Sequence, residues 1–234
     1  MRAGKRRTSP RKKVLIVDDH PFVREGLKQV IDQQPDFIVC ADVATPSEAL
    51  LAIGATRPDV AVVDLSLENG SGLELIKEIR TRGHALPVLV LSMHEESLHA
   101  ERVLRAGAQG YVMKRESPLV VVEALRQALA GKSYVSERMA GRLLRQYVGR
   151  RSRSDGEVTP LERLSDRELE IFQLIGQGHR RGSIAATLHI SAKTVETHCE
   201  RIKQKLNLLS ADELRKHAFL SAQNKVAGPT PAES

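Results

Sequence analysis

Residues 14–21 read VLIVDDHP, which is four aliphatic residues followed by two carboxylates, a histidine and a proline. An uninterrupted aliphatic run indicates a strand that is covered on both faces. Two interpretations of the aspartates are open at this point. Asp19 could cap a helix whose first turn contains Pro21, or Asp18 and Asp19 could hold a cation. The rest of the chain has to decide between a helix cap and a cation site.

Four more short apolar runs follow the first, and amphipathic helical patterns separate them. The five runs are VLIV at 14–17, FIVCADV at 37–43, VAVV at 60–63, VLVL at 88–91 and YVM at 111–113. Strands that alternate with helices predict an α/β fold, here a doubly wound, five-stranded parallel sheet with helices on both faces. In such a sheet the functional site lies at the carboxyl ends of the strands, where the strand order reverses.

Polar residues that stand directly after these runs would share one edge of the sheet. They are Asp18, Asp19, Asp64, Ser92 and Lys114. If the strand order is 2-1-3-4-5, three carboxylates meet there, and like charges this close need a cation to stay ionised. Oxygen ligands of this kind suit Mg²⁺. Taken singly, each residue also has a plain structural role: Ser92 could open a capping box, Lys114 could be a surface charge, and Asp64 could be a turn residue.

Residues 13–130 resemble the receiver domains of two-component response regulators, which have a flavodoxin-like fold. The resemblance rests on the two aspartates after the first run, on DLSLENGSG at 64–72, on LSMH at 91–94 and on YVMK at 111–114. It implies an acidic site that takes up a phosphoryl group from a sensor histidine kinase.

The same resemblance assigns roles to individual residues. Asp64 would accept the phosphoryl group, Lys114 would pair with it, Ser92 would hydrogen-bond it, and Tyr111 would be the aromatic switch residue that follows this bond. The implied Mg²⁺ ligands are Asp18, Asp19, Asp64 and the backbone carbonyl of Ser66. Glu68 stands where the family usually has proline, a departure that removes no functional group.

The residue types around Asp64 bear on the reaction class. A phosphatase that works through an aspartyl phosphate needs a general acid and base, and the haloacid-dehalogenase class places a second aspartate two residues after its nucleophile. Here that position is Ser66. We therefore expect phosphoryl transfer with slow hydrolysis rather than an enzyme, with Ser66 and His94 as tuners of the lifetime. An aspartyl-phosphate phosphatase is the alternative, which fast multiple turnover would support.

Charge is divided unevenly along the chain, whose net charge is +7. Residues 1–13 carry 7 basic and no acidic residues, residues 14–130 carry 11 and 17, and residues 131–234 carry 18 and 12. An acidic module followed by a basic one suggests that the basic half meets a polyanion such as nucleic acid. Cys40 and Cys199 lie far apart in the sequence, and no apolar run of 18 residues occurs. We expect a reducing, cytoplasmic setting and no membrane contact.

A second helical pattern begins with LSDRELEIFQLIGQG at 164–178, where Ser165 and Glu168 form a capping box. A short helix at 182–190 and a longer one from residue 191 to about 206 follow. The longer helix carries an apolar stripe made by Val195, Cys199, Ile202 and Leu206. Its opposite face is polar, which matches a helix-turn-helix. A generic three-helix domain is the alternative that periodicity leaves open.

Residues 161–221 resemble the output domain of the LuxR and NarL/FixJ class, on LSDRELEIF and on SAKTVETHCERIKQKL. The resemblance implies a partner, double-stranded DNA, and a homodimer when the receiver is phosphorylated. The implied DNA-binding residues are Lys193, Thr194, Glu196, Thr197, Glu200 and Arg201. Glu196 or Glu200 could accept a hydrogen bond from cytosine N4. Gly182 and Ser183 depart from the family's frequent Lys-Glu.

We therefore expect five segments and one function. The segments are a disordered basic tail at 1–12, a receiver domain at 13–130, a linker with a helix at 131–160, a LuxR-type helix-turn-helix domain at 161–221 and a disordered tail at 222–234. The expected function is that of a two-component response regulator, which accepts a phosphoryl group and regulates transcription through sequence-specific DNA binding. A phosphorylation-gated adaptor that binds protein is a further alternative, which salt-sensitive binding to duplex DNA would exclude.

Overall fold

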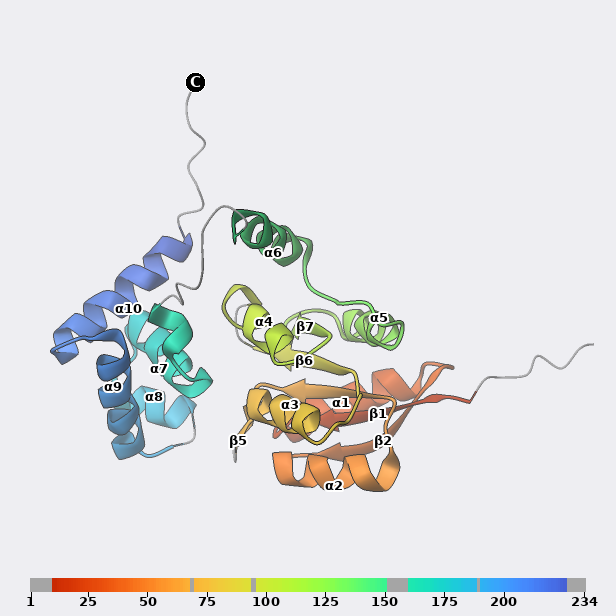
Figure 1. Cartoon of the computed structure of the whole chain (residues 1–234). Helices are drawn as coiled ribbons and strands as arrows, with labels where there is room; N and C mark the ends of the chain where they lie inside the picture. The colour runs from red at the N-terminus through yellow and green to blue at the C-terminus, as the bar shows by residue number, and fades with distance from the viewer. Residues whose placement is uncertain (1–9, 68–69, 94–95, 151–159, 189, 227–234) are drawn as a thin grey trace, which may run out of the picture. The chain divides into compact units, whose positions relative to one another are not determined.

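A computed structural model describes residues 10–67, 70–93, 96–150, 160–188 and 190–226 of the chain (Figure 1). The chain forms two compact units, residues 1–154 and 155–234. Most of the two tails, together with Glu68 and His94, lies outside the described residues, so the expectations for them are not addressed. Within the described ranges, no helix combines the length and the apolar character that crossing a membrane requires.

The N-terminal unit contains a five-stranded parallel sheet in the order β2-β1-β3-β6-β7. Its strands are β1 (Lys12–Val17), β2 (Phe37–Val43), β3 (Val60–Asp64), β6 (Val88–Ser92) and β7 (Gly110–Met113). The five predicted runs therefore form the predicted strands in the predicted order. β1 begins at Lys12, inside the segment assigned to the disordered tail, because Lys12 pairs in register with Phe37.

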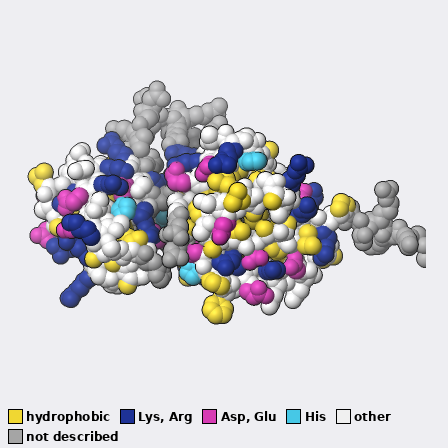
Figure 2. All heavy atoms as spheres, turned by 90° about the horizontal axis from the view of Figure 1, so that it is seen from below, with side chains coloured by type: hydrophobic (Ala, Val, Ile, Leu, Met, Phe, Trp, Pro, Cys, Tyr) yellow, Lys and Arg dark blue, Asp and Glu magenta, His cyan; other side chains and the backbone are white. Residues whose placement is uncertain are grey.

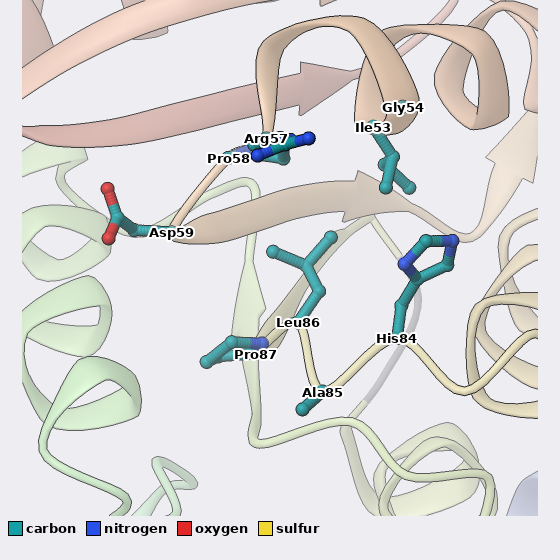
Figure 3. A pocket seen from close by; sticks show the side chains of 9 residues that line it. All are labelled: Ile53, Gly54, Arg57, Pro58, Asp59, His84, Ala85, Leu86 and Pro87. Carbon is teal, nitrogen blue, oxygen red and sulfur yellow. The ribbon is translucent and has the colours of Figure 1, made fainter.

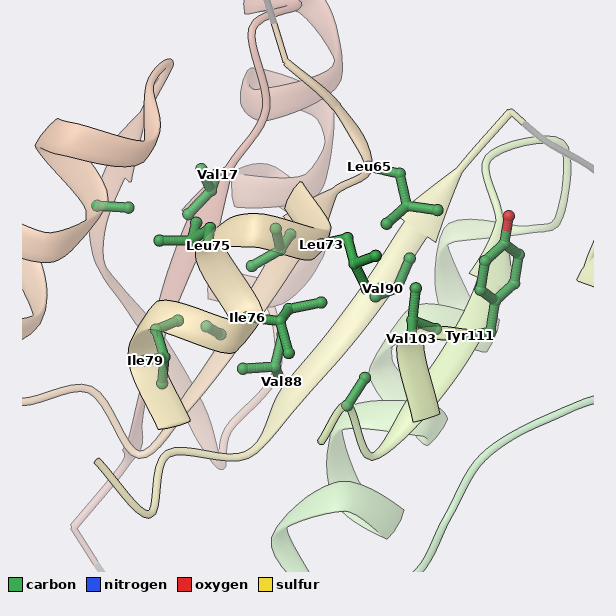
Figure 4. Packing of buried hydrophobic residues seen from close by; sticks show 14 of the residues in the cluster. Val17, Leu65, Leu73, Leu75, Ile76, Ile79, Val88, Val90, Val103 and Tyr111 are labelled. Atoms are coloured by element: carbon green, nitrogen blue, oxygen red, sulfur yellow. The ribbon is translucent and has the colours of Figure 1, made fainter. Parts of the chain in front are cut away.

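Helices cover both faces of this sheet, as expected for a doubly wound fold. They are α1 (Pro21–Asp32), α2 (Pro46–Thr56), α3 (Gly72–Thr81), α4 (Glu96–Arg105) and α5 (Pro118–Leu129). α1 and α5 pack on one face through residues such as Ile31 and Leu125. α2, α3 and α4 pack on the other face through residues such as Ile53, Ile76 and Val103, part of which Figure 4 shows.

Strand register brings the carboxyl ends of the strands to one edge. Val17 lies opposite Val63, Asp64 opposite Leu91, and Ser92 opposite Met113. Since parallel strands end on the same side, the polar residues at the ends of these strands lie along one edge of the sheet. A short antiparallel ladder, β4 (Ser66–Leu67) with β5 (Gly70–Ser71), lies directly after β3 and was not predicted.

The segment that follows α5 extends the N-terminal unit. Tyr134 forms a parallel bridge to Gly110 at the edge of the sheet, and α6 (Glu137–Arg150) follows. At the start of α6 the backbone N–H of Ser136 donates to Glu96 Oε1 at 2.8 Å, and the Ser136 hydroxyl donates to Oε2. Met139 is 2% exposed and belongs to the same core cluster as α4. A helix therefore forms within the predicted linker segment, and its first turns pack with α4 of the N-terminal unit.

The C-terminal unit is all-helical. It contains η1 (Pro160–Arg163), α7 (Asp166–Gly176), α8 (Arg181–Thr187), α9 (Ala192–Leu206) and α10 (Ala211–Val226). The expected capping box at Ser165 and Glu168 opens α7, and Ser191 caps α9 by accepting from the Thr194 N–H. α9 ends where Asn207 adopts a left-handed conformation with φ 54°, which asparagine tolerates better than most residues.

The end of the C-terminal unit differs from the expectation. The sequence predicted a last helix to about residue 220 and disorder from residue 222, but α10 continues to Val226, so that boundary is wrong. No glycine or proline stands between Ala211 and Val226 to stop the helix. The core of this unit is a cluster of buried residues from α7, α8, α9 and α10, among them Phe172, Ile184 and Leu214.

Candidate functional site

The crevice at the carboxyl edge of the sheet brings the expected residues together. Lys114 Nζ lies 2.7 Å from Asp18 Oδ2 and 2.7 Å from Asp64 Oδ2. The three side chains are almost fully buried, with exposed fractions of 7%, 2% and 3%. Asp64 Oδ1 accepts the backbone N–H of Ser66 at 3.3 Å. One lysine thus holds two carboxylates from neighbouring strands, β1 and β3, in a single ion cluster.

The plain structural roles expected for Asp19, Ser92 and Lys114 are wrong, whereas Asp64 does accept a turn hydrogen bond from Ser66. α1 is capped by His20, which makes no side-chain capping bond, so Asp19 is not the helix cap. Ser92 is the last residue of β6 and is completely buried, and α4 begins only at Glu96. Ser92 therefore stands too far from α4 to be its N-cap. Lys114 is buried rather than a surface charge.

Burial and charge both act on the ionisation of the cluster. Burial raises the pKa of Asp64 to about 6, against the lowering effect of Lys114, and the neighbouring charge of Asp18 raises it further. Burial alone would lower the pKa of Lys114, but Asp64 and Asp18 outweigh it and raise that pKa. An added positive charge would therefore favour the ionised form of Asp64.

The acidic residues fit a divalent cation. Asp18, Asp19, His20 and Asp64 each offer one ligand atom, and these atoms lie within 4.8 Å of one another. Asp18 Oδ2 and Asp19 Oδ1 are buried and accept no hydrogen bond from the described residues. Each has only an ion-pair contact, to Lys114 Nζ and to His20 Nδ1, both at 2.7 Å. Carboxylate oxygens without hydrogen bonds are suitable ligands for Mg²⁺.

The segment after β3 approaches the end of that strand closely. A Cβ on Gly72 would lie 2.0 Å from the backbone oxygen of Asp64, so any side chain there would displace the end of β3. Gly72 N–H donates to the Leu65 oxygen at 2.9 Å. The glycine at position 72 therefore allows α3 to begin directly against the strand that carries Asp64.

The two residues implied in switching lie on the same side of the sheet. Ser92 ends β6, the strand next to β3. Tyr111 on β7 is 1% exposed and packs in the cluster that contains Val103 of α4; Figure 4 labels both residues. The Tyr111 ring therefore occupies an inward position, in contact with the core rather than with solvent.

Two neighbours of the cluster were not singled out from the sequence. His20 Nδ1 lies 3.2 Å from Asp18 Oδ1 as well as 2.7 Å from Asp19 Oδ1. Arg24 Nη1 donates to the backbone oxygen of Asp18 at 2.5 Å. His20 could have been found, since it directly follows the aspartate pair. Arg24 gave no signal in the sequence, because its contact depends on how α1 packs beside β1.

A separate cavity of about 400 Å³ lies at the opposite edge of the sheet, near the starts of β3 and β6 (Figure 3). Arg57, Asp59 and His84 supply its polar lining, and Leu86 and Ile53 supply apolar contacts. It contains none of the expected site residues. The cavity is therefore distinct from the ion cluster.

The polar face of α9 is the second candidate site. Val195, Cys199 and Ile202 are buried in the core of the C-terminal unit, as the apolar stripe predicted. Five of the six implied DNA-binding residues are classed as exposed and Glu196 as partly exposed; the six are Lys193, Thr194, Glu196, Thr197, Glu200 and Arg201. α9 therefore buries one face and leaves the other accessible to a partner.

Ion pairs connect several side chains on this face. Lys193 Nζ lies 2.9 Å from Glu196 Oε2, and Lys203 Nζ lies 2.9 Å from Glu200 Oε2. Arg181, at the start of α8, reaches across to α9 and places Nη1 3.5 Å from Glu196 Oε1. Lys193, with Arg181 as a lesser cause, lowers the pKa of Glu196. Arg181 was not among the predicted residues.

The surface charge is mixed on the face drawn in Figure 2. Lys and Arg side chains alternate with Asp and Glu side chains on both units. The opposite net charges of the two halves therefore do not appear as surfaces of a single sign on that face.

Comparisons with known proteins agree with this geometry. The family model described as "Response regulator receiver domain" matches residues 14–126, and the one described as "Bacterial regulatory proteins, luxR family" matches residues 162–218. The fold and the acidic crevice define the first half as a receiver, and the helix-turn-helix defines the second. The chain belongs to the response regulators with a LuxR-type DNA-binding domain, the NarL/FixJ family.

Similar curated proteins carry both halves. One is the "Oxygen regulatory protein NreC" of Staphylococcus haemolyticus, 35% identical over 88% of this chain and 96% of the relative. Another is a "Nitrate/nitrite response regulator protein homolog" of Haemophilus influenzae, 33% identical over 85% of this chain and 91% of the relative.

Solved structures are similar as well. RcsB from Salmonella enterica serovar Typhimurium, bound to promoter rprA with a phosphomimetic present, matches with a TM-score of 0.56 and 25% identity, covering 89% of this chain and 98% of that one. A LuxR-family response regulator from an Aurantimonas species matches with a TM-score of 0.55 and 36% identity, covering 59% of this chain and 99% of that one.

Proposed function

We propose that Asp64 accepts a phosphoryl group and that this modification controls binding of the C-terminal unit to duplex DNA. The observation that carries the proposal is the buried cluster of Asp18, Asp64 and Lys114, where one cation sits 2.7 Å from two carboxylates. Such a site is short of positive charge and attracts both a divalent cation and a phosphoryl group.

The reaction assigned to this site is the transfer of a phosphoryl group from a histidine nitrogen to a carboxylate oxygen. A carboxylate oxygen of Asp64 attacks the phosphorus of a phosphohistidine on a sensor kinase, the N–P bond breaks, an O–P bond forms, and the leaving imidazole nitrogen takes up a proton. Asp18, Asp19, Asp64 and the Ser66 carbonyl would hold Mg²⁺, which when bound neutralises charge on the phosphoryl oxygens.

The protein's own residues would then stabilise the product. Lys114 is close enough to Asp64 to move from its carboxylate to a phosphoryl oxygen, and the Ser92 hydroxyl is placed at the end of the adjacent strand to donate to another. Tyr111 lies in the core that α4 shares. No second carboxylate follows Asp64 at residue 66, so we expect slow hydrolysis and do not class the protein as an enzyme.

The DNA-binding half of the proposal uses the exposed face of α9. Lys193, Thr194, Thr197 and Arg201 would mostly contact phosphates, and Glu196 or Glu200 would accept from a cytosine amino group. A single small helix-turn-helix reads few base pairs, so we propose that the phosphorylated protein acts as a homodimer. With a histidine kinase and duplex DNA as partners, we propose that the protein works in the cytoplasm and does not bind a membrane.

The decisive experiment compares the wild type with Asp64→Ala by genomic footprinting in the presence of the phosphodonor system. We expect the wild type to protect discrete duplex sites and the variant to lose them. In vitro, incorporation of one phosphoryl group with a small phosphodonor and Mg²⁺ should depend on Asp64. Equal occupancy by both proteins would remove phosphorylation from the function, and rapid multiple turnover of the phosphodonor would favour a phosphatase.

A further inference from the structure

We propose that Arg181 is a positioning residue that holds the Glu196 carboxylate for base recognition and thereby sets a base preference of the C-terminal unit. The inference rests on the DNA-binding half of the proposed function and deepens it. Arg181 itself is not assigned a base contact.

The geometry places one cation on each oxygen of Glu196. Lys193 Nζ lies 2.9 Å from Oε2, and Arg181 Nη1 lies 3.5 Å from Oε1. Lys193 is on the same helix, one turn before Glu196, so this contact constrains the carboxylate only relative to α9. Arg181 is the first residue of α8. Its contact therefore links the Glu196 carboxylate on α9 to the start of α8, the other helix of the helix-turn-helix.

A carboxylate at a DNA interface needs such restraint. Phosphates repel an unpaired carboxylate, and glutamate has several rotamers to lose on binding. The cytosine amino group suits a carboxylate acceptor in the major groove, whereas the adenine amino group lies beside the N7 acceptor, which repels a carboxylate. When Lys193 exchanges to a phosphate, Arg181 still pairs with Glu196, balances its charge and restricts its orientation, and preorganisation of this kind favours the matched base over the others.

The residue after Arg181 supports a role for this arginine in linking α8 to α9. Gly182 follows it, and nothing lies within 4 Å of the place where a Cβ on Gly182 would be. Glycine there is not required by packing, and it weakens the start of α8. The contact from Arg181 to Glu196 links that weak first turn to α9.

Arg180 offers a matched control. It is the N-cap residue of α8, is exposed like Arg181 and carries the same charge. It forms no ion pair with any residue in the described part of the chain. Replacing either arginine removes one positive charge from the same short segment, so both changes should weaken non-specific attraction to DNA to a similar degree.

The test selects bound sequences from randomised duplexes with the full-length protein. The variants are Arg181→Ala, Arg181→Lys, Arg180→Ala, Glu196→Gln and the double variant Arg181→Ala/Glu196→Gln. Glu196→Gln identifies the base position that Glu196 reads. At that position we expect Arg181→Ala to lower the preference by roughly fivefold or more, the lower end of what one good base contact discriminates. Arg180→Ala should leave the preference unchanged, and Arg181→Lys should retain part of it.

The double variant separates positioning from a direct contact. If Arg181 acts through Glu196, adding Arg181→Ala to Glu196→Gln has no further effect on base preference. Equal preferences for the Arg181 and Arg180 variants would overturn the inference, and so would a further loss in the double variant. Wild-type protein that selects no sequence would overturn the proposed function together with the inference, whereas a selective wild type with an unchanged Arg181→Ala variant would overturn the inference alone. Thermal melting of each variant confirms that it is folded.

Discussion

Two ion clusters in the molecule have similar distances and opposite surroundings. Lys114 lies 2.7 Å from Asp18 and from Asp64, with all three side chains at most 7% exposed. Lys193 lies 2.9 Å from Glu196, with side chains 84% and 39% exposed. A buried charge depends strongly on its partner, whereas an exposed pair contributes little to stability and exchanges readily with a new partner. The first cluster is built by the fold, and the second is accessible to a binding partner.

The largest effect on stability is expected from Lys114→Met. The change leaves the buried carboxylates Asp18 and Asp64 without their shared cation, and breaking a buried pair in this way costs about 3–5 kcal/mol. Urea denaturation followed by circular dichroism, with amide exchange in β3 as a local probe, measures the loss. Lys132→Met is the control, since Lys132 is exposed. A loss below about 1 kcal/mol for Lys114→Met would mean that the cluster behaves like the exposed pair.

The next largest effect tests whether α6 is packed as part of the N-terminal unit. Met139→Ala removes a side chain that is 2% exposed and packs with α4, so we expect a loss of about 2–3 kcal/mol in unfolding free energy. Leu144→Ala, on the same helix but 65% exposed, should change it by less than about 0.5 kcal/mol. Similar small losses for both variants, measured by urea denaturation, would show that α6 is a free linker.

The same contrast between buried and exposed groups decides what the sequence could predict. The five aliphatic runs and their order gave the sheet, because continuous apolar strands leave few alternatives. A parallel sheet with the assumed strand order 2-1-3-4-5 then placed Asp18, Asp64 and Lys114 at one edge.

The features that were missed depend on packing between segments far apart in sequence. The bond from Ser136 to Glu96 and the burial of Met139 follow from where α6 lies on α4, and nothing local encodes that. The contact of Arg181 with Glu196 likewise needs the angle between α8 and α9. The end of α10 was missed for a local reason, since its last turn carries no stop signal.

A smaller, pH-dependent effect is expected at a buried acid in the C-terminal unit. Burial raises the pKa of Glu168, but hydrogen bonds from Lys205 and Ser165 outweigh it and lower that pKa below its ordinary value of 4.5. A carboxyl group whose pKa is lowered in the folded state stabilises the fold above pH 4.5. This stabilisation is lost as the pH falls through the folded-state pKa. Glu168→Gln should therefore cost about 1–2 kcal/mol at neutral pH.

The difference between Glu168→Gln and the wild type should shrink in acid, as urea midpoints at a series of pH values would show. Glu200→Gln is the matched control, because Glu200 also pairs with a lysine but is 56% exposed. Its effect should stay within about 0.5 kcal/mol at all pH values. If the stability difference between Glu168→Gln and the wild type did not change with pH, the charge of Glu168 would not contribute to stability. Burial would then not distinguish Glu168 from Glu200.

The smallest effect on stability, and the clearest one on binding, is expected from Lys193→Ala. Its partner Glu196 is also solvent-accessible, so the unfolding free energy should change by less than about 0.5 kcal/mol. On DNA the same lysine would neutralise a phosphate, and its loss should reduce the slope of log affinity against log salt by about 0.9 for each copy bound. Lys216→Ala, which removes an exposed charge from α10, should leave that slope nearly unchanged. A stability loss comparable to that of Lys114→Met, with an unchanged salt slope, would reverse the distinction between the two clusters, because Lys193 would then belong to the fold and not to the DNA interface.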